Sequence, residues 1–257
     1  MITRATLVRG RAAILAAAGD HPYARLYAGR DNELSGYLLD DATIWTGPGP
    51  HGPTGYASGD AEQVVGLAAD LLSVGALGDL RWLHLPRLDA GVLETYLKVT
   101  HRDDWDFRWT VTPPPVQPAE PRVERLTEAD HDAITDLVDS SFPTSTTRPG
   151  DPRVRAWYGI RSGDRVVAAG ADRSRGGTGF LAGITVAVDV RGQGLGAALT
   201  AAMTRALLDE TEEVTLGVLT ENLGAIRLYE RLGFAGSMPR TSVALAPSAL
   251  LGAGTSA

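Results

Sequence analysis

The residues best placed to do chemistry lie in the segment ITVAVDVRGQGLGA, from Ile184 to Ala197. An apolar, β-rich run precedes Gly192, Gly194 and Gly196, and an alanine-rich stretch with helical spacing follows them. Glycine lets the backbone adopt unusual dihedral angles and come close to a ligand. The first N–H groups of a helix have no partner inside it and carry partial positive charge. The segment therefore predicts an anion site, to which Arg191 adds a full charge.

Two classes of ligand, and one purely structural role, are compatible with this turn. GQGLGA also matches the dinucleotide-binding pattern G-x-G-x-x-G/A, and Glu221 after the next strand could bind a ribose. Against a dinucleotide, the preceding strands read as hairpins, and too little chain follows Val186 for a doubly wound domain. Glu221 also comes later than the usual spacing of about 20 residues. The glycines could otherwise serve only tight packing, and the absence of G-K-[ST] excludes a P-loop.

A second set of polar residues occurs in NLGAIRLYERLGF, from Asn222 to Phe234. Asn222 is placed to cap a helix or to offer its amide to a ligand. Tyr229 lies seven residues later, two turns along the same helix face. Apolar neighbours can anchor this helix, so Tyr229 is either a half-buried packing residue or a phenol that points toward the site.

These two segments together resemble the GNAT acyltransferase superfamily over about residues 121–247. The matching motifs are Arg191-x-x-Gly194-x-Gly196 and Asn222…Tyr229…Leu232-Gly233-Phe234. The resemblance implies an α+β (mixed α/β) fold, with a GNAT-like splayed mixed β-sheet flanked by helices. It implies acetyl-CoA as cosubstrate and no metal, with acetyl-CoA lying between the Gly179–Val188 and Val214–Thr220 strands.

The resemblance also implies roles for individual residues. Backbone groups of Ile184, Thr185 and Val186 would hold the pantetheine arm and the thioester carbonyl. Asn222 would contact the cosubstrate, and Tyr229 would protonate the departing thiolate. The pyrophosphate would bind to the turn formed by Arg191, Gly192, Gln193, Gly194, Leu195, Gly196 and Ala197. Fixed backbone donors suit the charge that develops on a thioester oxygen, and a tyrosine hydroxyl is a reasonable acid.

A general base is not assigned by the sequence. Many members of the superfamily carry a glutamate on the strand before the asparagine, but Leu216–Thr220 holds no ionisable residue. Asp172, Asp189 and Glu221 are near in sequence, although each reads as a surface or turn residue. The proton is removed elsewhere, or the acceptor supplies an amine of low pKa.

The proline-rich segment Thr112–Pro121 predicts a domain boundary, because proline continues neither a helix nor a central strand. We expect an N-terminal α/β domain at residues 1–118 and a GNAT domain at 119–257. The first half lacks an R-x-x-G-x-G turn, yet its order of elements could be a degenerate GNAT-like copy. In it, we expect strands at Ser35–Trp45 and Leu80–Leu85, a helix at Ala61–Val74, and a turn-rich loop at Thr46–Gly59.

The composition of the chain narrows the classes of function that are compatible with the sequence. The net charge of −7 argues against a nucleic-acid partner. The absence of cysteine excludes disulfides and thiolate chemistry and fits a cytoplasmic protein. No run approaches the roughly 18 apolar residues of a membrane span. The five histidines show no metal-binding spacing.

The sequence therefore predicts an acetyl-CoA-dependent N-acetyltransferase. The acceptor would be a primary amine of a small molecule or peptide that attacks the thioester directly, and a homodimer is compatible with the sequence. Two alternatives stay open: a CoA-binding or sensing protein without turnover, and an NAD(P)-binding oxidoreductase.

Overall fold

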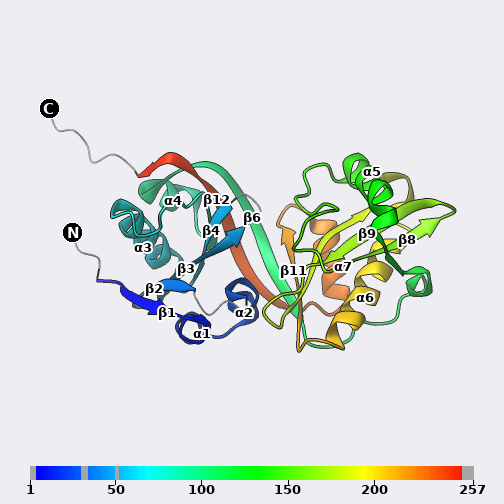
Figure 1. Cartoon of the computed structure of the whole chain (residues 1–257), viewed down its shortest axis with the longest axis horizontal. Helices are drawn as coiled ribbons and strands as arrows, with labels where there is room; N and C mark the ends of the chain where they lie inside the picture. Colours follow the sequence, from blue (N-terminus) through cyan, green and yellow to red (C-terminus); the bar gives the residue numbers. More distant parts are fainter. Residues whose placement is uncertain (1–3, 30–33, 50–51, 251–257) are drawn as a thin grey trace. The chain divides into compact units, whose positions relative to one another are not determined.

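The computed structural model describes residues 4–29, 34–49 and 52–250. The chain forms two compact units (Figure 1). The first unit comprises Met1–Asp106 and Met238–Ala257, and the second comprises Phe107–Ser237. The sequence-based boundary between residues 118 and 119 stays a prediction. None of the helices in the described ranges is long and apolar enough to cross a membrane.

The first unit begins with a strand and two helices and continues as a sheet with further helices. Its elements are β1 (Thr6–Arg9), α1 (Arg11–Ala18), α2 (Pro22–Ala28), β2 (Ser35–Leu39), β3 (Ala42–Gly49), β4 (Gly52–Ser58), α3 (Ala61–Ser73), β5 (Trp82–Pro86), α4 (Ala90–Tyr96) and β6 (Leu97–Thr110). Strands β1 to β4 pair antiparallel in order, and β4 pairs parallel to β5. The late strand β12 (Gly236–Leu250) pairs antiparallel to β5.

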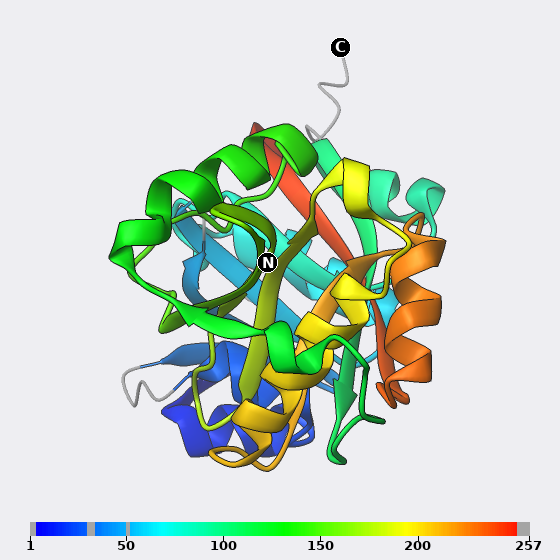
Figure 2. The ribbon, with the colours of Figure 1, turned by 90° about the vertical axis from the view of Figure 1, so that its right-hand side faces the viewer.

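The second unit carries the segments that the sequence singled out. Its elements are η1 (Glu120–Arg122), β7 (Glu124–Leu126), η2 (Glu128–Asp130), α5 (His131–Ser141), β8 (Ala156–Ser162), β9 (Arg165–Asp172), β10 (Gly179–Val186), η3 (Val188–Val190), α6 (Leu195–Leu208), β11 (Val214–Leu219) and α7 (Leu223–Arg231). Strands β7 to β10 pair antiparallel in order, whereas β10 pairs parallel to β11. Figure 2 shows α6 of this unit in yellow and α7 in orange. The predicted mixed α/β sheet flanked by helices is confirmed.

Strands β10 and β11 diverge along their length. Their paired residues run only from Gly179 opposite Val214 to Leu181 opposite Leu216. The register of β10 on β9 also shifts between Ala182 and Thr185, a β-bulge that re-aims the strand. The sheet is therefore splayed at the ends of β10 and β11 that lead into the glycine turn and α7.

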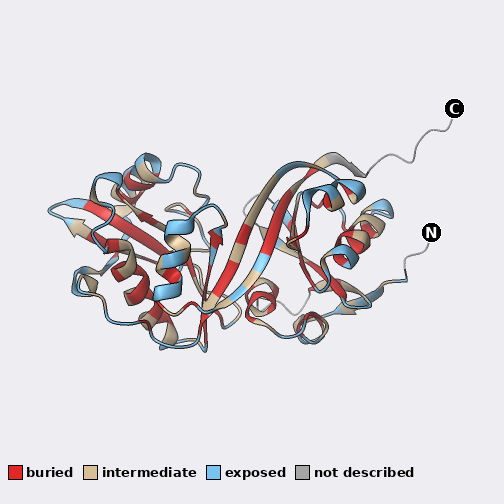
Figure 3. Ribbon diagram, turned by 180° about the vertical axis from the view of Figure 1, so that it is seen from behind, coloured by how far each residue is buried: buried red, intermediate tan, exposed pale blue. Residues whose placement is uncertain are grey.

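The core of the second unit explains the position of α6. Its apolar residues recur at four-residue steps and are buried at Leu195, Leu199, Met203 and Leu207. This stripe packs on the sheet, as i, i+4 spacing on one helix face requires. Figure 3 shows the buried strands in red and the outward sides of the helices in pale blue. Packing on the sheet therefore fixes the N-terminus of α6 at the end of β10.

The two units repeat one order of elements. In each, a strand and then helix (α1 and α2 in the first unit, α5 in the second) precede three antiparallel strands, which are followed by a helix, a parallel strand and a further helix. Strands β4 and β5 with α3 thus correspond to β10 and β11 with α6. The repeat agrees with the prediction that the first half has GNAT-like order.

Two predictions for the first half are wrong. The Ser35–Trp45 stretch is not one strand, because Asp40, with φ of 50°, turns the chain between β2 and β3. The Thr46–Gly59 stretch is not a loop, because β3 and β4 form a hairpin through it, with Pro48 opposite Pro53. Burial of Thr54 and Tyr56 on β4 outweighs the turn-forming composition there.

Candidate functional site

A cavity of about 650 Å³ lies in the second unit at the splayed end of the sheet. The residues that line it come from the end of α5, β10, the glycine turn, α6 and α7. They are Ser141, Phe142, Ile184, Thr185, Val186, Val190, Arg191, Gly192, Gly194, Leu195, Gly196, Ala197, Thr200, Asn222, Gly224, Ala225, Leu228, Tyr229 and Arg231. Every site residue predicted from the sequence except Gln193 is among them.

The glycine turn presents an open helix end to this cavity. Gly192 and Gly194 have φ values of 81° and 78°, in the left-handed region that glycine adopts without strain. A Cβ at either position would meet no described atom within 4 Å. No side chain caps α6, whose first internal hydrogen bond runs from Ala198 N to Gly194 O (3.0 Å). The earlier N–H groups of α6 are therefore available to an anion.

Gly196 brings three elements together behind this helix end. A Cβ on Gly196 would lie 3.5 Å from a Val186 methyl on β10 and 3.7 Å from a Leu228 methyl on α7. The helix end therefore sits against both the splayed strand and α7. One elongated ligand can contact all three elements.

The bulge in β10 lies at the cavity wall. Gly183 has φ of 61°, and Thr147 packs so closely that a Cβ at Gly183 would lie 3.0 Å from the Thr147 Cβ. The Thr185 hydroxyl donates to the carbonyl of Gly183 (3.0 Å). The ladder with β9 is interrupted between Ala182 and Thr185, and Ile184, within this interruption, lines the cavity. Fixed peptide dipoles of this kind can stabilise developing charge on an oxygen.

Arg191 links the turn to its surroundings. Its Nε donates to the carbonyl of Val186 (3.2 Å), and its Nη2 donates to the carbonyl of Ser141 (2.9 Å). The guanidinium thus ties the end of α5 to the end of β10 while keeping its charge beside the open helix end.

Tyr229 is the ionisable group of α7 that is buried at the cavity. Its side chain is 8% exposed and packs on Phe234, with ring centroids 5.9 Å apart. Burial raises the pKa of Tyr229 to about 12. Within the described residues its hydroxyl has no hydrogen-bond partner. The phenol is therefore neutral at physiological pH and has a proton to donate.

Asn222 caps α7, as one of its two predicted roles requires. Its Oδ1 accepts a hydrogen bond from Ala225 N (3.1 Å). The carbonyl side of the amide is thereby engaged with the helix, and the NH₂ group stays available to a ligand. In this geometry Asn222 can cap α7 through Oδ1 and contact a ligand through its NH₂ group at the same time.

The carboxylates near the site in sequence are engaged elsewhere. Asp189 receives two hydrogen bonds from Arg165 (2.7 and 2.9 Å), which lower the pKa of Asp189. Asp172 accepts from the backbone N–H of Ser174 (2.8 Å). Glu221 is exposed and does not line the cavity. The ionisable side chains of the lining are Arg191, Tyr229 and Arg231.

Sequence reasoning missed several lining residues. Arg231 could have been predicted from the sequence, because it lies three residues after Leu228 on the same helix face. Thr200, whose hydroxyl donates to Gly196 O (2.8 Å), follows Gly196 by one turn. Ser141 and Phe142 carried no local signal, because only the packing of α5 on the sheet brings them to the cavity.

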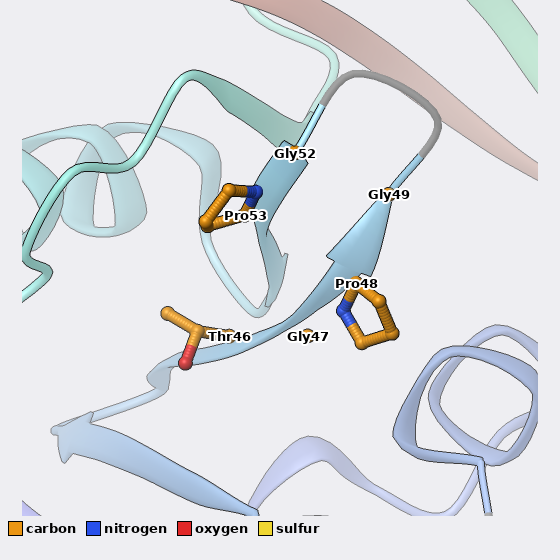
Figure 4. A pocket seen from close by; sticks show the side chains of 6 residues that line it. All are labelled: Thr46, Gly47, Pro48, Gly49, Gly52 and Pro53. Carbon is orange, nitrogen blue, oxygen red and sulfur yellow. The ribbon is translucent and has the colours of Figure 1, made fainter.

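A second pocket, of about 400 Å³, lies in the first unit at the β3–β4 hairpin (Figure 4). Its lining consists of glycine and proline with Thr46, and it presents no ionisable side chain. The described part of the chain also contains no group of three or more residues able to hold a metal ion. The cavity at α6 is thus the site with chemistry to explain.

Comparison with known proteins agrees with this geometry. Residues 157–241 match the family model described as FR47-like protein. No curated protein matches the chain. A solved structure from Sphaerobacter thermophilus, a GCN5-related N-acetyltransferase, is 19% identical, with a TM-score of 0.58 and 95% of each chain covered. A GCN5-related N-acetyltransferase from Kribbella flavida is 20% identical, covering 93% of this chain and 96% of that one, with a TM-score of 0.52.

A third structure, described as a GNAT-family acetyltransferase from Novosphingobium aromaticivorans, is 24% identical and has a TM-score of 0.55. It covers 89% of this chain and 94% of its own. The chain has the GNAT fold. The resemblance first noted in the Arg191 and Asn222 motifs is thereby confirmed, and both motifs lie inside the FR47-like match.

Proposed function

We propose that this chain transfers an acetyl group from acetyl-CoA to a primary amine of a small molecule or peptide. The observation that carries the proposal is the uncapped N-terminus of α6, which opens into the same cavity as Tyr229. Acetyltransferase activity is also what the solved GNAT structures of similar fold are named for.

The residues present fit acetyl-CoA. A diphosphate is an anion of the size that free N–H groups of a helix end bind, and Arg191 adds positive charge there. Ile184, Val186 and Leu228 give the cavity an apolar wall suited to an acyl-bearing arm. The thioester supplies the activated acetyl group, and the chain supplies binding, orientation and a proton.

In the proposed reaction the neutral amine nitrogen attacks the thioester carbonyl carbon. A C–N bond forms, the C–S bond breaks, and the amine loses a proton to solvent. The Tyr229 hydroxyl protonates the departing thiolate and regains its proton from solvent. Peptide groups at the β10 bulge, around Ile184, stabilise the oxygen that becomes negative during attack.

We also propose that the first half is a degenerate GNAT copy without a cosubstrate site. It repeats the order of elements of the second unit. The corresponding helix, α3, is capped by the carboxylate of Asp60, which occupies the donors that an anion would need.

Two measurements test the proposal. Isothermal titration of the full chain with acetyl-CoA, NAD and NADP should show binding of acetyl-CoA only. Release of free CoA thiol should then depend on an added amine drawn from a panel of small amines and peptides. Binding of acetyl-CoA with no thiol release for any amine would favour a sensing protein. Binding of NAD in its place would favour an oxidoreductase.

A further inference from the structure

Arg173 lies beside β10, on the face of the sheet opposite α6. It directly follows β9, and its N–H donates to the carbonyl of Phe180 (2.8 Å), which continues the ladder onto β10. A Cβ at Gly170 would lie 2.9 Å from the sulfur of Met203 on α6. Because side chains along a strand alternate between its faces, Gly170 and Asp172 face α6 and Arg173 faces the other way.

The contacts of Arg173 place its guanidinium near the bulge of β10. Its Nη1 donates to the hydroxyl of Thr147 (3.3 Å), and its guanidinium carbon lies 6.0 Å from the centroid of the Phe180 ring. Thr147 is buried, and its Cβ would lie 3.0 Å from a Cβ at Gly183. Gly183 directly precedes Ile184 of the cavity lining. One threonine thus separates this cation from the strand segment at which the proposed reaction takes place.

The same face of the sheet is open next to the bulge. The pairing of β11 with β10 ends at Leu216, opposite Leu181. Gly217, the next residue of β11, has no side chain and is exposed, and Leu219 beyond it is also exposed. In the proposed reaction the cosubstrate occupies the cavity at α6 and α7, so the acceptor has room to approach the thioester from this face.

The charges around Arg173 favour a negatively charged group on the acceptor. Thr147, which accepts from the guanidinium, is neutral and cancels none of its charge. Arg153 donates to both carboxylate oxygens of Asp151 (2.8 and 2.7 Å). Burial acts to raise the pKa of Asp151, but the hydrogen bonds from Arg153 and the charges of Arg153 and Arg173 hold it below its usual value. Two arginines thus face one acid, which leaves the group with net positive charge.

On the basis of the proposed function, we propose that the acceptor is a small amine that also carries a carboxylate, and that Arg173 binds this carboxylate. A planar guanidinium can donate two parallel N–H bonds to a carboxylate. In such a molecule the amine lies only a few bonds from the carboxylate, so binding at Arg173 holds the nitrogen near the bulge. The carboxylate takes no part in the transfer. The nitrogen forms the C–N bond, the C–S bond breaks, and the products are an N-acetylated amino acid and CoA.

The test compares each amino acid with its carboxamide, which lacks the negative charge. Release of CoA thiol from acetyl-CoA is measured with the full chain for the protein amino acids, β-alanine and γ-aminobutyrate, each against its amide. The best acid should have a kcat/KM about 10- to 100-fold above that of its amide, as expected for hydrogen bonds between charged groups. The amine of an α-amino amide has the lower pKa and is more often neutral, so a preference for the acid cannot come from the amine.

Two variants assign the preference to one arginine. Arg173→Gln should bring the kcat/KM of the acid down to that of its amide and bind acetyl-CoA with wild-type affinity. Arg173→Lys keeps the charge without the planar pair of donors and should keep part of the preference. Arg155→Gln is the matched control, because Arg155 is exposed and pairs with Asp172 and Glu210 on the α6 face. R155Q should keep the whole preference.

Three results would overturn the inference. Equal kcat/KM for acids and amides in the wild-type chain would show that the carboxylate is not recognised, and the proposed acetyltransferase activity would stand. If R173Q slowed acids and amides by the same factor, Arg173 would serve only to hold Thr147 at the bulge. Absence of thiol release with every acid and amide would refute the proposed function, and the inference with it. Circular dichroism melting curves establish that each variant is folded.

Discussion

Asp60 and Gly194 stand at the same place in the two units, and only Asp60 has a side chain that can close its helix end. Asp60 precedes α3, and its Oδ1 accepts the N–H groups of Glu62 (3.1 Å) and Gln63 (3.0 Å). Gly194 precedes α6 with no side-chain cap. Both helices connect two parallel strands at the same point of the repeated order. The carboxylate thus stabilises one helix end and keeps anions away, whereas the glycine leaves the other open.

Substituting Gly194→Asp should reproduce the closed end of α3 at α6. The new carboxylate would compete for the N–H donors and repel the diphosphate. We expect the affinity for acetyl-CoA, measured by titration calorimetry, to fall about 100-fold or more, because like charges placed together cost several kcal/mol. Because φ is positive here, Gly194→Asn is the control: it carries the same backbone strain without the charge. Unchanged affinity in Gly194→Asp would contradict an anion site, whereas equal losses for the two variants would assign the effect to strain or to capping rather than to charge.

Substituting Tyr229→Phe should lower kcat and leave the dissociation constant of acetyl-CoA unchanged. The variant keeps the ring that packs on Phe234 and removes only the proton donor. General acid catalysis contributes about 10²- to 10⁴-fold, so we expect thiol release to slow by about 100-fold. With the pKa of Tyr229 raised to about 12, the phenol keeps its proton, and the wild-type rate should show no loss from this group up to pH 10. Wild-type kcat in the variant would remove the acid role.

The part of the site that the sequence predicted is the part encoded locally. The helix end follows from three glycines at alternate positions, and the location of Tyr229 follows from helical spacing after Asn222. Helix α3 and the β8–β9 hairpin were predictable for the same reason, since hydrophobic period and turn residues lie within short windows. Such features need no knowledge of distant contacts.

The features of the fold and the site that the sequence did not predict depend on contacts between residues distant in sequence. Glycine and proline between Thr46 and Gly59 indicated a loop, but pairing of β3 with β4 and burial of Tyr56 made a hairpin. The donation from Arg191 to Ser141 joins residues that no local pattern relates. The pairing of β12 with β5 brings the end of the chain into the first unit, which a linear division at residue 118 does not anticipate.

From the surroundings of His21 we predict that the folded protein loses stability in mild acid. Its Nδ1 accepts from Ala24 N (3.1 Å) as the cap of α2, and its Nε2 lies 2.9 Å from the Ser58 hydroxyl. Burial, with the charge of Arg240, lowers the pKa of His21 to about 4. Because the unfolded chain takes up this proton near pH 6.5, the stabilisation is complete above pH 6.5 and is lost as the pH falls toward 4. The loss is about 3 kcal/mol.

Urea unfolding at pH values from 7 to 4 measures this effect. His21→Asn is the matched variant, because asparagine is a good helix cap that does not titrate. Its free energy of unfolding should change much less across this window. Asp104 and Asp151, whose pKa values are held below 3.8 by Arg102 and Arg153 despite burial, titrate at lower pH and do not mask the difference. Parallel curves for wild type and H21N would assign the acid sensitivity elsewhere.

From the contacts of Arg240 on β12 we predict that the last strand of the chain stabilises the first unit. Its side chain is buried, and its guanidinium carbon lies 3.9 Å from the centroid of the Tyr23 ring. Its Nη2 donates to the carbonyls of Ala57 on β4 (2.6 Å) and His84 on β5 (3.0 Å). One cation thereby joins the parallel strands that correspond to β10 and β11 of the second unit.

Substituting Arg240→Met should therefore cost about 3 kcal/mol in the free energy of unfolding, measured with urea at pH 7. Methionine retains apolar volume but removes the cation over Tyr23 and both hydrogen bonds to strand carbonyls, each worth about 1–3 kcal/mol when buried. Arg165→Met is the control, since its pair with Asp189 is more than half exposed and should contribute little to the free energy of unfolding. Arg240 is buried and Arg165 is exposed. An equal loss of stability from the two substitutions would therefore contradict a bridging role for Arg240.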